Sequence, residues 1–96
     1  MTFSFHPGAQ REVDDAIRYY ERCRPGLGYE FADEVYAAIH RVMRYPEAWG
    51  ELSPNTRRCL VTRFPYGVVY QAKPGTIRII AVAHLSRRPG YWRERV

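Results

Sequence analysis

The strongest structural signal in this sequence lies in residues 57–92, which read RRCLVTRFPYGVVYQAKPGTIRIIAVAHLSRRPGYW. Three runs rich in β-branched and aromatic residues are separated there by turn residues, first Phe64-Pro65-Tyr66 and then Lys73-Pro74-Gly75. Runs of this composition with such separators are typical of strands joined by short turns. Residues 57–84 are therefore predicted to form a three-stranded meander.

The last of these runs, residues 76–84, is apolar on both faces. A strand of this kind is normally central in its sheet and covered on both sides. We expect it to lie inside the sheet and to deliver His84 and a basic, aromatic tail to one edge of the domain. Strict alternation assigns its side chains to two faces, with Ile77, Ile79, Ala81 and Ala83 on one and Ile80 and Val82 on the other.

Two amphipathic helices are predicted before the meander. Apolar residues at helical spacing predict a first helix from about Gly8 to Cys23, with His6 as a poor cap at its start. A break at residues 24–28 precedes a second apolar set, from Phe31 to Val42, and that helix should end before Pro46. Because the break is short, the helices should form an antiparallel hairpin. The polar face of the first helix carries Arg11, Glu12, Asp15, Arg18 and Arg22.

The remaining segments complete an α+β arrangement. Thr2 to Phe5 alternates polar and apolar residues and is predicted to be a short strand added to the meander. Residues 45–56 contain prolines, a glycine and an asparagine, and they are predicted to be a loop. The order β-α-α-β-β-β predicts a helical hairpin packed on one face of a small antiparallel sheet, with the other face partly open.

Length and composition limit the possible functions. The chain of 96 residues fits one small domain, residues 1–96, and no apolar run is long enough to span a bilayer. The N-terminus lacks the basic start and apolar core of a signal peptide, so we expect a cytoplasmic protein. Cys23 and Cys59 suit that compartment as reduced thiols. No metal-ligand pattern is visible, so neither a metal nor a cofactor is expected.

Positive charge is concentrated in the second half of the chain. The net charge is +5, yet residues 1–56 hold six arginines against nine acidic residues. Residues 57–96 hold eight arginines and Lys73 against Glu94 alone. Such asymmetry suggests that the second half faces an anionic partner, either nucleic acid or an acidic protein. The alternative is a solvated basic surface without a partner.

Four segments, in this order, resemble one protein family. They are Pro7 and Ala9 before Tyr19-Tyr20, Pro25-Gly26-Leu27-Gly28 before Phe31, Arg63-Phe64-Pro65-Tyr66 with Tyr70, and His84-Leu85-Ser86-Arg87-Arg88-Pro89-Gly90-Tyr91-Trp92. Together they resemble the RelE/ParE superfamily of type II toxins over nearly the whole chain. The resemblance implies the RelE/ParE toxin fold and a small basic toxin. It also implies a cognate antitoxin, expected to be acidic with a DNA-binding N-terminal part, that holds the toxin inactive.

The resemblance implies one of two targets, since RelE-like members cut mRNA on the ribosome and ParE-like members block DNA gyrase. Nucleases of the first kind use Lys, Arg and Tyr to stabilise phosphorane charge and to move protons. This chain has Leu60, Gly67 and Leu85 where such an enzyme is expected to place cations. Losing one transition-state donor can cost on the order of 10²-fold in rate. The sequence therefore favours a ParE-like inhibitor that acts by binding rather than by catalysis.

Each hypothesis has its own candidate residues. The target-binding candidates are Arg58, Arg63, Arg87, Arg88, Tyr91, Trp92 and Arg93. The catalytic candidates for the nuclease alternative are Arg58, His84, Arg87 and Tyr91. Structural roles stay open, because a histidine at a strand end is often structural and aromatic residues such as Tyr91 and Trp92 can fold back onto the sheet. A third hypothesis is a toxin fold that has lost toxicity and serves only as a binding partner.

Overall fold

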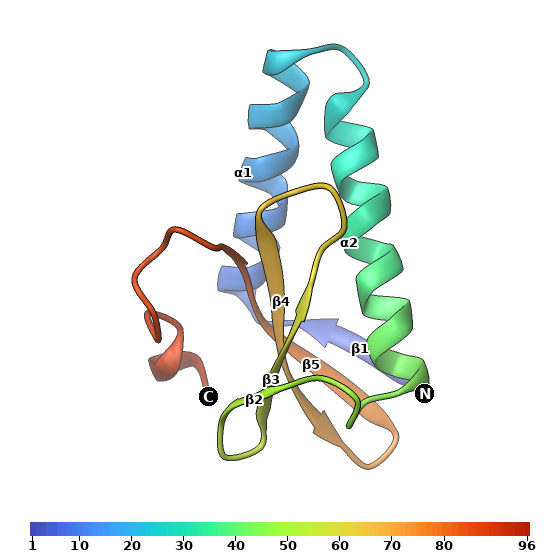
Figure 1. Ribbon diagram of the computed structural model, residues 1–96, viewed down its shortest axis with the longest axis vertical. Helices are drawn as coiled ribbons and strands as arrows, with labels where there is room; N and C mark the ends of the chain where they lie inside the picture. The colour runs from blue at the N-terminus through green and yellow to red at the C-terminus, as the bar shows by residue number, and fades with distance from the viewer.

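The computed structural model describes residues 1–96 and contains two helices and a five-stranded sheet (Figure 1). The elements are β1 (Thr2–Phe5), α1 (Pro7–Cys23), α2 (Leu27–Arg44), β2 (Glu51–Ser53), β3 (Thr56–Leu60), β4 (Tyr66–Lys73), β5 (Thr76–His84) and a final 3-10 turn, Arg93–Arg95. The strand order is β1-β5-β4-β3-β2. β1 runs parallel to β5, and every other neighbouring pair is antiparallel. The predicted α+β class and the three-stranded meander are confirmed.

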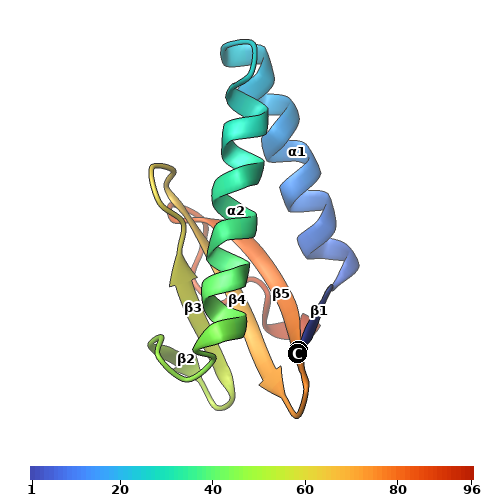
Figure 2. The ribbon, with the colours of Figure 1, turned by 90° about the vertical axis from the view of Figure 1, so that its right-hand side faces the viewer.

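The two helices form an antiparallel hairpin that covers one face of the sheet, and its tip projects beyond the strands (Figures 1 and 2). Their apolar stripes pack against side chains of β4 and β5, and most of the residues in them are buried. Phe31, Val35 and Ile39 of α2, for example, belong to the same buried cluster as Ile77 and Ile79 of β5. Burial of a large apolar side chain contributes about 1.5–3 kcal/mol, so this layer stabilises the fold. Neither helix is both long and apolar enough to cross a membrane.

The start of α1 differs from the expectation that His6 is a poor cap. His6 occupies the N-cap position, and its Nδ1 accepts a hydrogen bond of 2.9 Å from the backbone N–H of Gly8. Desolvation, together with the nearby guanidinium groups of Arg95 and Arg78, lowers the pKa of His6. The lowered pKa favours the neutral ring, whose Nδ1 can accept the helix N–H.

The segment predicted to be a loop, residues 45–56, contains the short strand β2, which corrects that prediction. β2 pairs with β3 through a tight hairpin in which Glu51 lies opposite Arg57. Asn55 adopts a φ of 58° at the turn, a left-handed conformation that asparagine tolerates well. A strand of three residues is too short to give an alternating pattern, and therefore the sequence showed only its turn residues.

β5 contains a β-bulge that reverses the predicted alternation of its side chains. Val69 lies opposite Ala81, but Tyr70 lies opposite Ile79, so Ile80 has no partner on β4. As a result Ala81 and Ile79 lie on opposite faces of the sheet, whereas strict alternation had predicted that they share one face. Val82 instead lies in the core under the helices, whereas Ile80 and Ala81 belong to a second cluster on the opposite face. All of these residues are apolar, so their sequence pattern cannot reveal an inserted residue.

The C-terminal residues 85–96, called the tail below, lie on the sheet face opposite the helices (Figure 2). Trp92 is 5 % exposed and packs against Val69, Ile80 and Ala81. The face that was expected to be partly open is therefore partly covered by the chain itself. The prediction that the last strand is central and covered is confirmed, because β5 lies between β1 and β4 and is buried along most of its length.

Candidate functional site

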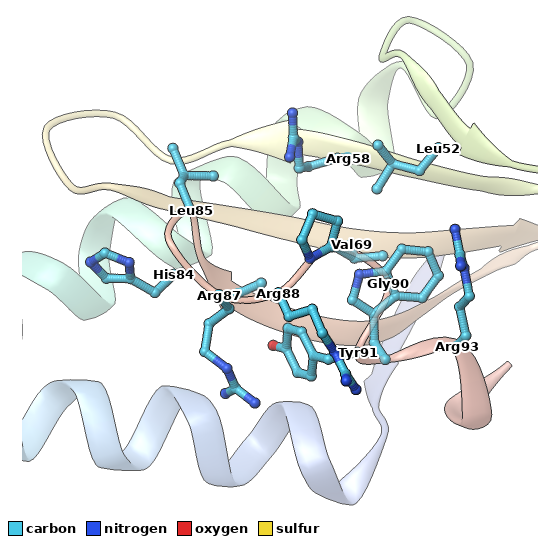
Figure 3. A pocket seen from close by; sticks show the side chains of 13 residues that line it. Leu52, Arg58, Val69, His84, Leu85, Arg87, Arg88, Gly90, Tyr91 and Arg93 are labelled. Carbon is cyan, nitrogen blue, oxygen red and sulfur yellow. The ribbon is translucent and has the colours of Figure 1, made fainter.

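A pocket of about 180 Å³ lies between the tail and the sheet (Figure 3). Its basic side chains come from three elements: Arg58 of β3, His84 at the end of β5, and arginines of the tail. The lining contains no Asp or Glu, and its apolar part includes Val69 and Trp92. The four lining arginines are Arg58, Arg87, Arg88 and Arg93, and the pocket is called the arginine pocket below.

Three of these guanidinium groups have no anionic partner within the protein. Arg58, Arg88 and Arg93 make no side-chain hydrogen bond or ion pair, and all three are exposed. Arg58 lies across Gly67 of β4, where an added Cβ would stand 2.7 Å from Arg58 Cδ. Like charges gathered at one concave surface produce a positive potential that attracts an anionic partner. A planar guanidinium can bind a carboxylate or a phosphate through two parallel hydrogen bonds.

Tyr91 is held at one wall of the pocket by Glu12 of α1. The Tyr91 hydroxyl donates a 2.7 Å hydrogen bond to Glu12 Oε2, and the Arg87 guanidinium lies 3.8 Å from the centre of the Tyr91 ring. Figure 3 shows Arg87 and Tyr91 on the side of the pocket that faces α1. Burial, followed by the hydrogen bond to Glu12, raises the pKa of Tyr91 well above its usual value. The phenol is therefore a proton donor at neutral pH and is not available as a base.

Glu12 itself was assigned to the polar face of the first helix, and its burial corrects that assignment. The Glu12 side chain is only 14 % exposed and accepts hydrogen bonds from Tyr91, Arg95 and the backbone N–H of Val82. Glu12 directly precedes the buried residue Val13, so it stands at the boundary of the apolar stripe. That boundary position was the one signal in the sequence that could have drawn attention to it.

His84 contacts groups of its own turn rather than a carboxylate. Its Nδ1 lies 3.0 Å from the Ser86 N–H and 2.7 Å from Ser86 Oγ. The imidazole also meets the Tyr66 ring edge-to-face, with 5.1 Å between ring centres. These contacts orient the ring at the rim of the arginine pocket, but they supply no acid that would pair with it for proton transfer.

Arg63 is the one target-binding candidate that lies away from the arginine pocket. It stands in the turn after β3 with a φ of 72°, and its guanidinium lies 2.7 Å from Glu30 and 3.9 Å from Glu34 of α2. The hydrogen bond from Arg63, followed by that from Arg24, lowers the pKa of Glu30. The turn carries Arg63 to the helical layer, on the side of the sheet opposite the tail.

The structure brings the other candidates together. Arg58, Arg87, Arg88, Tyr91, Trp92 and Arg93 all line the arginine pocket, as does His84 of the nuclease set. Trp92 is buried and forms part of the pocket's apolar lining, so its surface is largely covered by the chain itself. No group of three or more His, Cys, Asp or Glu side chains lies close enough together to hold a metal ion.

Comparison with known proteins places this chain in one family. The sequence model of the ParE toxin of the type II toxin–antitoxin system parDE matches residues 3–89. No curated protein matches the chain in sequence. A solved structure described as the chromosomal ParDE TA system from P. aeruginosa contains a chain of similar fold. The two chains share 14 % sequence identity and a TM-score of 0.77, over 90 % of this chain and 97 % of that one. Since the matched range covers nearly all of the sequence, the chain belongs to the ParE toxin family of type II toxin–antitoxin systems.

Proposed function

We propose that this ParE-family toxin acts in the cytoplasm by binding DNA gyrase, and that the arginine pocket makes the contact. The observation that carries the proposal is the set of three unpaired guanidinium groups around a pocket without an acidic residue. Holding like charges together is unfavourable until an anion arrives, and therefore an anionic partner gains binding energy from this arrangement. An acidic protein surface, or DNA held by the enzyme, would supply that anion.

We further propose that a cognate antitoxin neutralises the toxin by binding it. The helical hairpin presents exposed aromatic side chains that the core does not use: Tyr19 is 59 % exposed and Tyr29 is 74 % exposed. Exposed aromatic residues of this kind are typical of surfaces that accept an amphipathic helix of a partner. An acidic antitoxin, ordered on binding, would complement both this surface and the net positive charge of the toxin.

An mRNA endonuclease remains the second candidate, because all four of its candidate residues meet at one pocket. Arg58, His84, Arg87 and Tyr91 line the arginine pocket, so phosphate binding there is geometrically reasonable. The pocket supplies fewer of the groups that RNA cleavage needs for proton transfer and charge stabilisation. The Tyr91 proton is donated to Glu12, and the positions of Leu60 and Leu85 provide no cation. A non-toxic protein that only binds an antitoxin is the third candidate.

Two assays on the purified toxin separate these candidates. DNA supercoiling by purified gyrase is measured over a range of toxin concentrations, and mRNA integrity is measured on translating ribosomes. We expect inhibited supercoiling with intact mRNA, and restoration of supercoiling by the product of the neighbouring antitoxin gene. Cuts positioned at codons with normal supercoiling would establish the nuclease instead. No effect in either assay, together with no growth arrest in cells, would indicate the third candidate, a non-toxic protein that only binds an antitoxin.

A further inference from the structure

The N-terminal helix and the tail meet at one carboxylate, that of Glu12, which is only 14 % exposed. Glu12 Oε2 accepts from the Tyr91 hydroxyl at 2.7 Å, and both Glu12 oxygens accept from Arg95 at 3.1 Å in a two-pronged pair. Arg87 approaches the same carboxylate at 3.7 Å. Hydrogen bonds between ionised partners are roughly twice as strong as neutral ones, especially where the partners are shielded from water.

The position of this carboxylate follows from an unpaired strand edge. β1 pairs with β5 only as far as Ile79, so the edge of β5 beyond that residue has no neighbouring strand. Side chains take its place, because Glu12 accepts from the Val82 N–H at 3.0 Å and Arg95 donates to the Ile80 carbonyl at 3.1 Å. Glu12 and Arg95 together complete the hydrogen bonds of an edge that would otherwise be exposed.

The tail has few other attachments to the protein. Beyond Leu85, whose N–H bonds to the Pro65 carbonyl, every backbone hydrogen bond donated by a tail residue stays within residues 84–96. The remaining attachments are the packing of Trp92, the contacts to Glu12 and the hydrogen bond from Arg95 to the Ile80 carbonyl. Gly8 makes room for these contacts, since an added Cβ there would stand 2.6 Å from Arg95 Cζ.

We propose that Glu12 is the positioning residue of the target site: it fastens Tyr91 and Arg95 to the edge of β5 and thereby sets where the tail arginines stand around the arginine pocket. The part of this proposal that concerns the target rests on the proposed function, whereas the fastening does not. Tyr91 and Arg95 lie beyond residue 89, where the range matched to the ParE family ends.

The test compares Glu12→Gln with Asp15→Asn, a change of the same charge on the same helix. Asp15 is exposed, its carboxylate pairs with Arg18, and it makes no hydrogen bond or ion pair with the tail, so its substitution should leave the attachment of the tail unchanged. Hydrogen exchange is measured amide by amide in the full-length protein. Glu12→Gln should speed exchange in residues 91–96 about tenfold, because the tail then opens without the rest of the fold. The helical amides should keep their wild-type rates, and Asp15→Asn should match wild type throughout.

A second variant keeps the proposal testable if Glu12→Gln fails to fold. Arg95→Gln leaves the Glu12 carboxylate in place with Tyr91 and Val82, and it should loosen the same tail amides. Wild-type exchange of residues 91–96 in both variants would overturn the proposal. Faster exchange spread over the helices as well would overturn it too, since Glu12 would then stabilise the whole fold rather than the tail.

Gyrase inhibition and growth arrest give the functional readout. The concentration of Glu12→Gln needed for half-inhibition should rise about tenfold, equivalent to roughly 1.4 kcal/mol, while Asp15→Asn should inhibit like wild type. A loosened tail with unchanged inhibition would overturn the positioning role. If the wild-type toxin arrests growth but spares gyrase, the proposed target is wrong. Growth arrest is then the readout. Weaker arrest by Glu12→Gln than by Asp15→Asn supports the positioning role, and equal arrest by the two variants overturns it.

Discussion

Gly67 determines how Arg58 lies in the arginine pocket. The Arg58 side chain crosses directly over this glycine, and a methyl group there would stand 2.7 Å from Arg58 Cδ and 2.9 Å from Arg58 Cγ. The backbone of Gly67 is in an ordinary strand conformation with no positive φ, so the strand itself can accept alanine. The missing side chain therefore serves the placement of a neighbouring cation rather than the backbone.

Gly67→Ala should displace Arg58 and weaken gyrase inhibition with little change in the fold. Loss of one charge-assisted contact is expected to raise the half-inhibitory concentration by about tenfold or more. Gly50→Ala is the matched control, because a Cβ at Gly50 meets no atom within 4 Å. Equal inhibition by both variants and wild type would show that Arg58 does not contact the target.

Single residues also show where sequence reasoning succeeds and where it stops. The sequence shows leucines at positions 60 and 85, and the structure adds that both side chains lie at the surface, 54 % and 47 % exposed. The role of Glu12 could not be predicted, because helical periodicity assigns a face but not the partner that a distant tail brings to it. Arg63 was grouped with the pocket arginines because the sequence does not show which side of the sheet a turn faces.

The beginning of α1 depends on the protonation state of His6. The neutral Nδ1 accepts the Gly8 N–H, whereas a protonated ring would have no acceptor to offer. The pKa of His6 is lowered in the folded protein, so the unfolded state binds a proton more readily. Stability from this cap is therefore complete above the unfolded pKa of about 6.5 and is lost as pH falls below it.

We predict that His6→Asn removes part of the acid sensitivity of folding. Urea midpoints are measured from pH 7.5 to pH 5 for wild type and for this variant, whose amide oxygen can cap the helix at every pH. The wild-type midpoint should fall more steeply than that of His6→Asn. His40→Asn, which changes an exposed histidine of α2, should keep the wild-type slope. Parallel curves for all three proteins would refute this account of the cap.

The longer elements were predictable from the sequence, and their details were not. Apolar spacing located both helices, and the turn residues located β3, β4 and β5. The bulge at Ile80 escaped detection because every residue around it is apolar, so the register is set by the pairing with β4. β2 escaped because its three residues are ordered by pairing with β3 rather than by their own pattern.

For the molecule as a whole, two tyrosines, the buried Tyr70 and the partly buried Tyr66, make stability depend on alkaline pH. Burial raises the pKa of Tyr66 and of Tyr70 to about 12, and the Tyr70 hydroxyl donates to the Pro46 carbonyl at 2.7 Å. Unfolded tyrosines lose their protons near pH 10, so between pH 10 and pH 12 the unfolded state binds fewer protons than the folded state. The free energy of unfolding must therefore decrease as pH rises through this window.

The unfolding free energy should fall by roughly 2 kcal/mol between pH 10 and pH 12 through Tyr70 alone. Urea unfolding at pH 9, 10 and 11 measures the beginning of this decline. Tyr70→Phe should have a shallower slope, although it is less stable at pH 9 because the Pro46 carbonyl loses its donor. Tyr29→Phe, at a position 74 % exposed, should retain the wild-type slope. A flat wild-type profile up to pH 11 would rule out this coupling.

The distribution of charge over the whole molecule leads to the central claim, which is that the arginine pocket binds the target. The acidic residues lie mainly in the helical half, whereas the arginine pocket collects basic residues of the second half on the opposite face of the sheet. If that face contacts the target, removing charge there should matter far more than removing the same charge from the helices. Arg22 and Arg44 of the helices are exposed and make no ion pair, so they provide the comparison.

The most direct measurement is gyrase supercoiling titrated with three toxins: wild type, Arg88→Gln with Arg93→Gln, and Arg22→Gln with Arg44→Gln. The account predicts that the pocket variant needs at least about tenfold more protein for half-inhibition. The helix variant should inhibit like wild type. Equal loss of inhibition in both double variants, or full inhibition by the pocket variant, would contradict the claim that the arginine pocket binds the target.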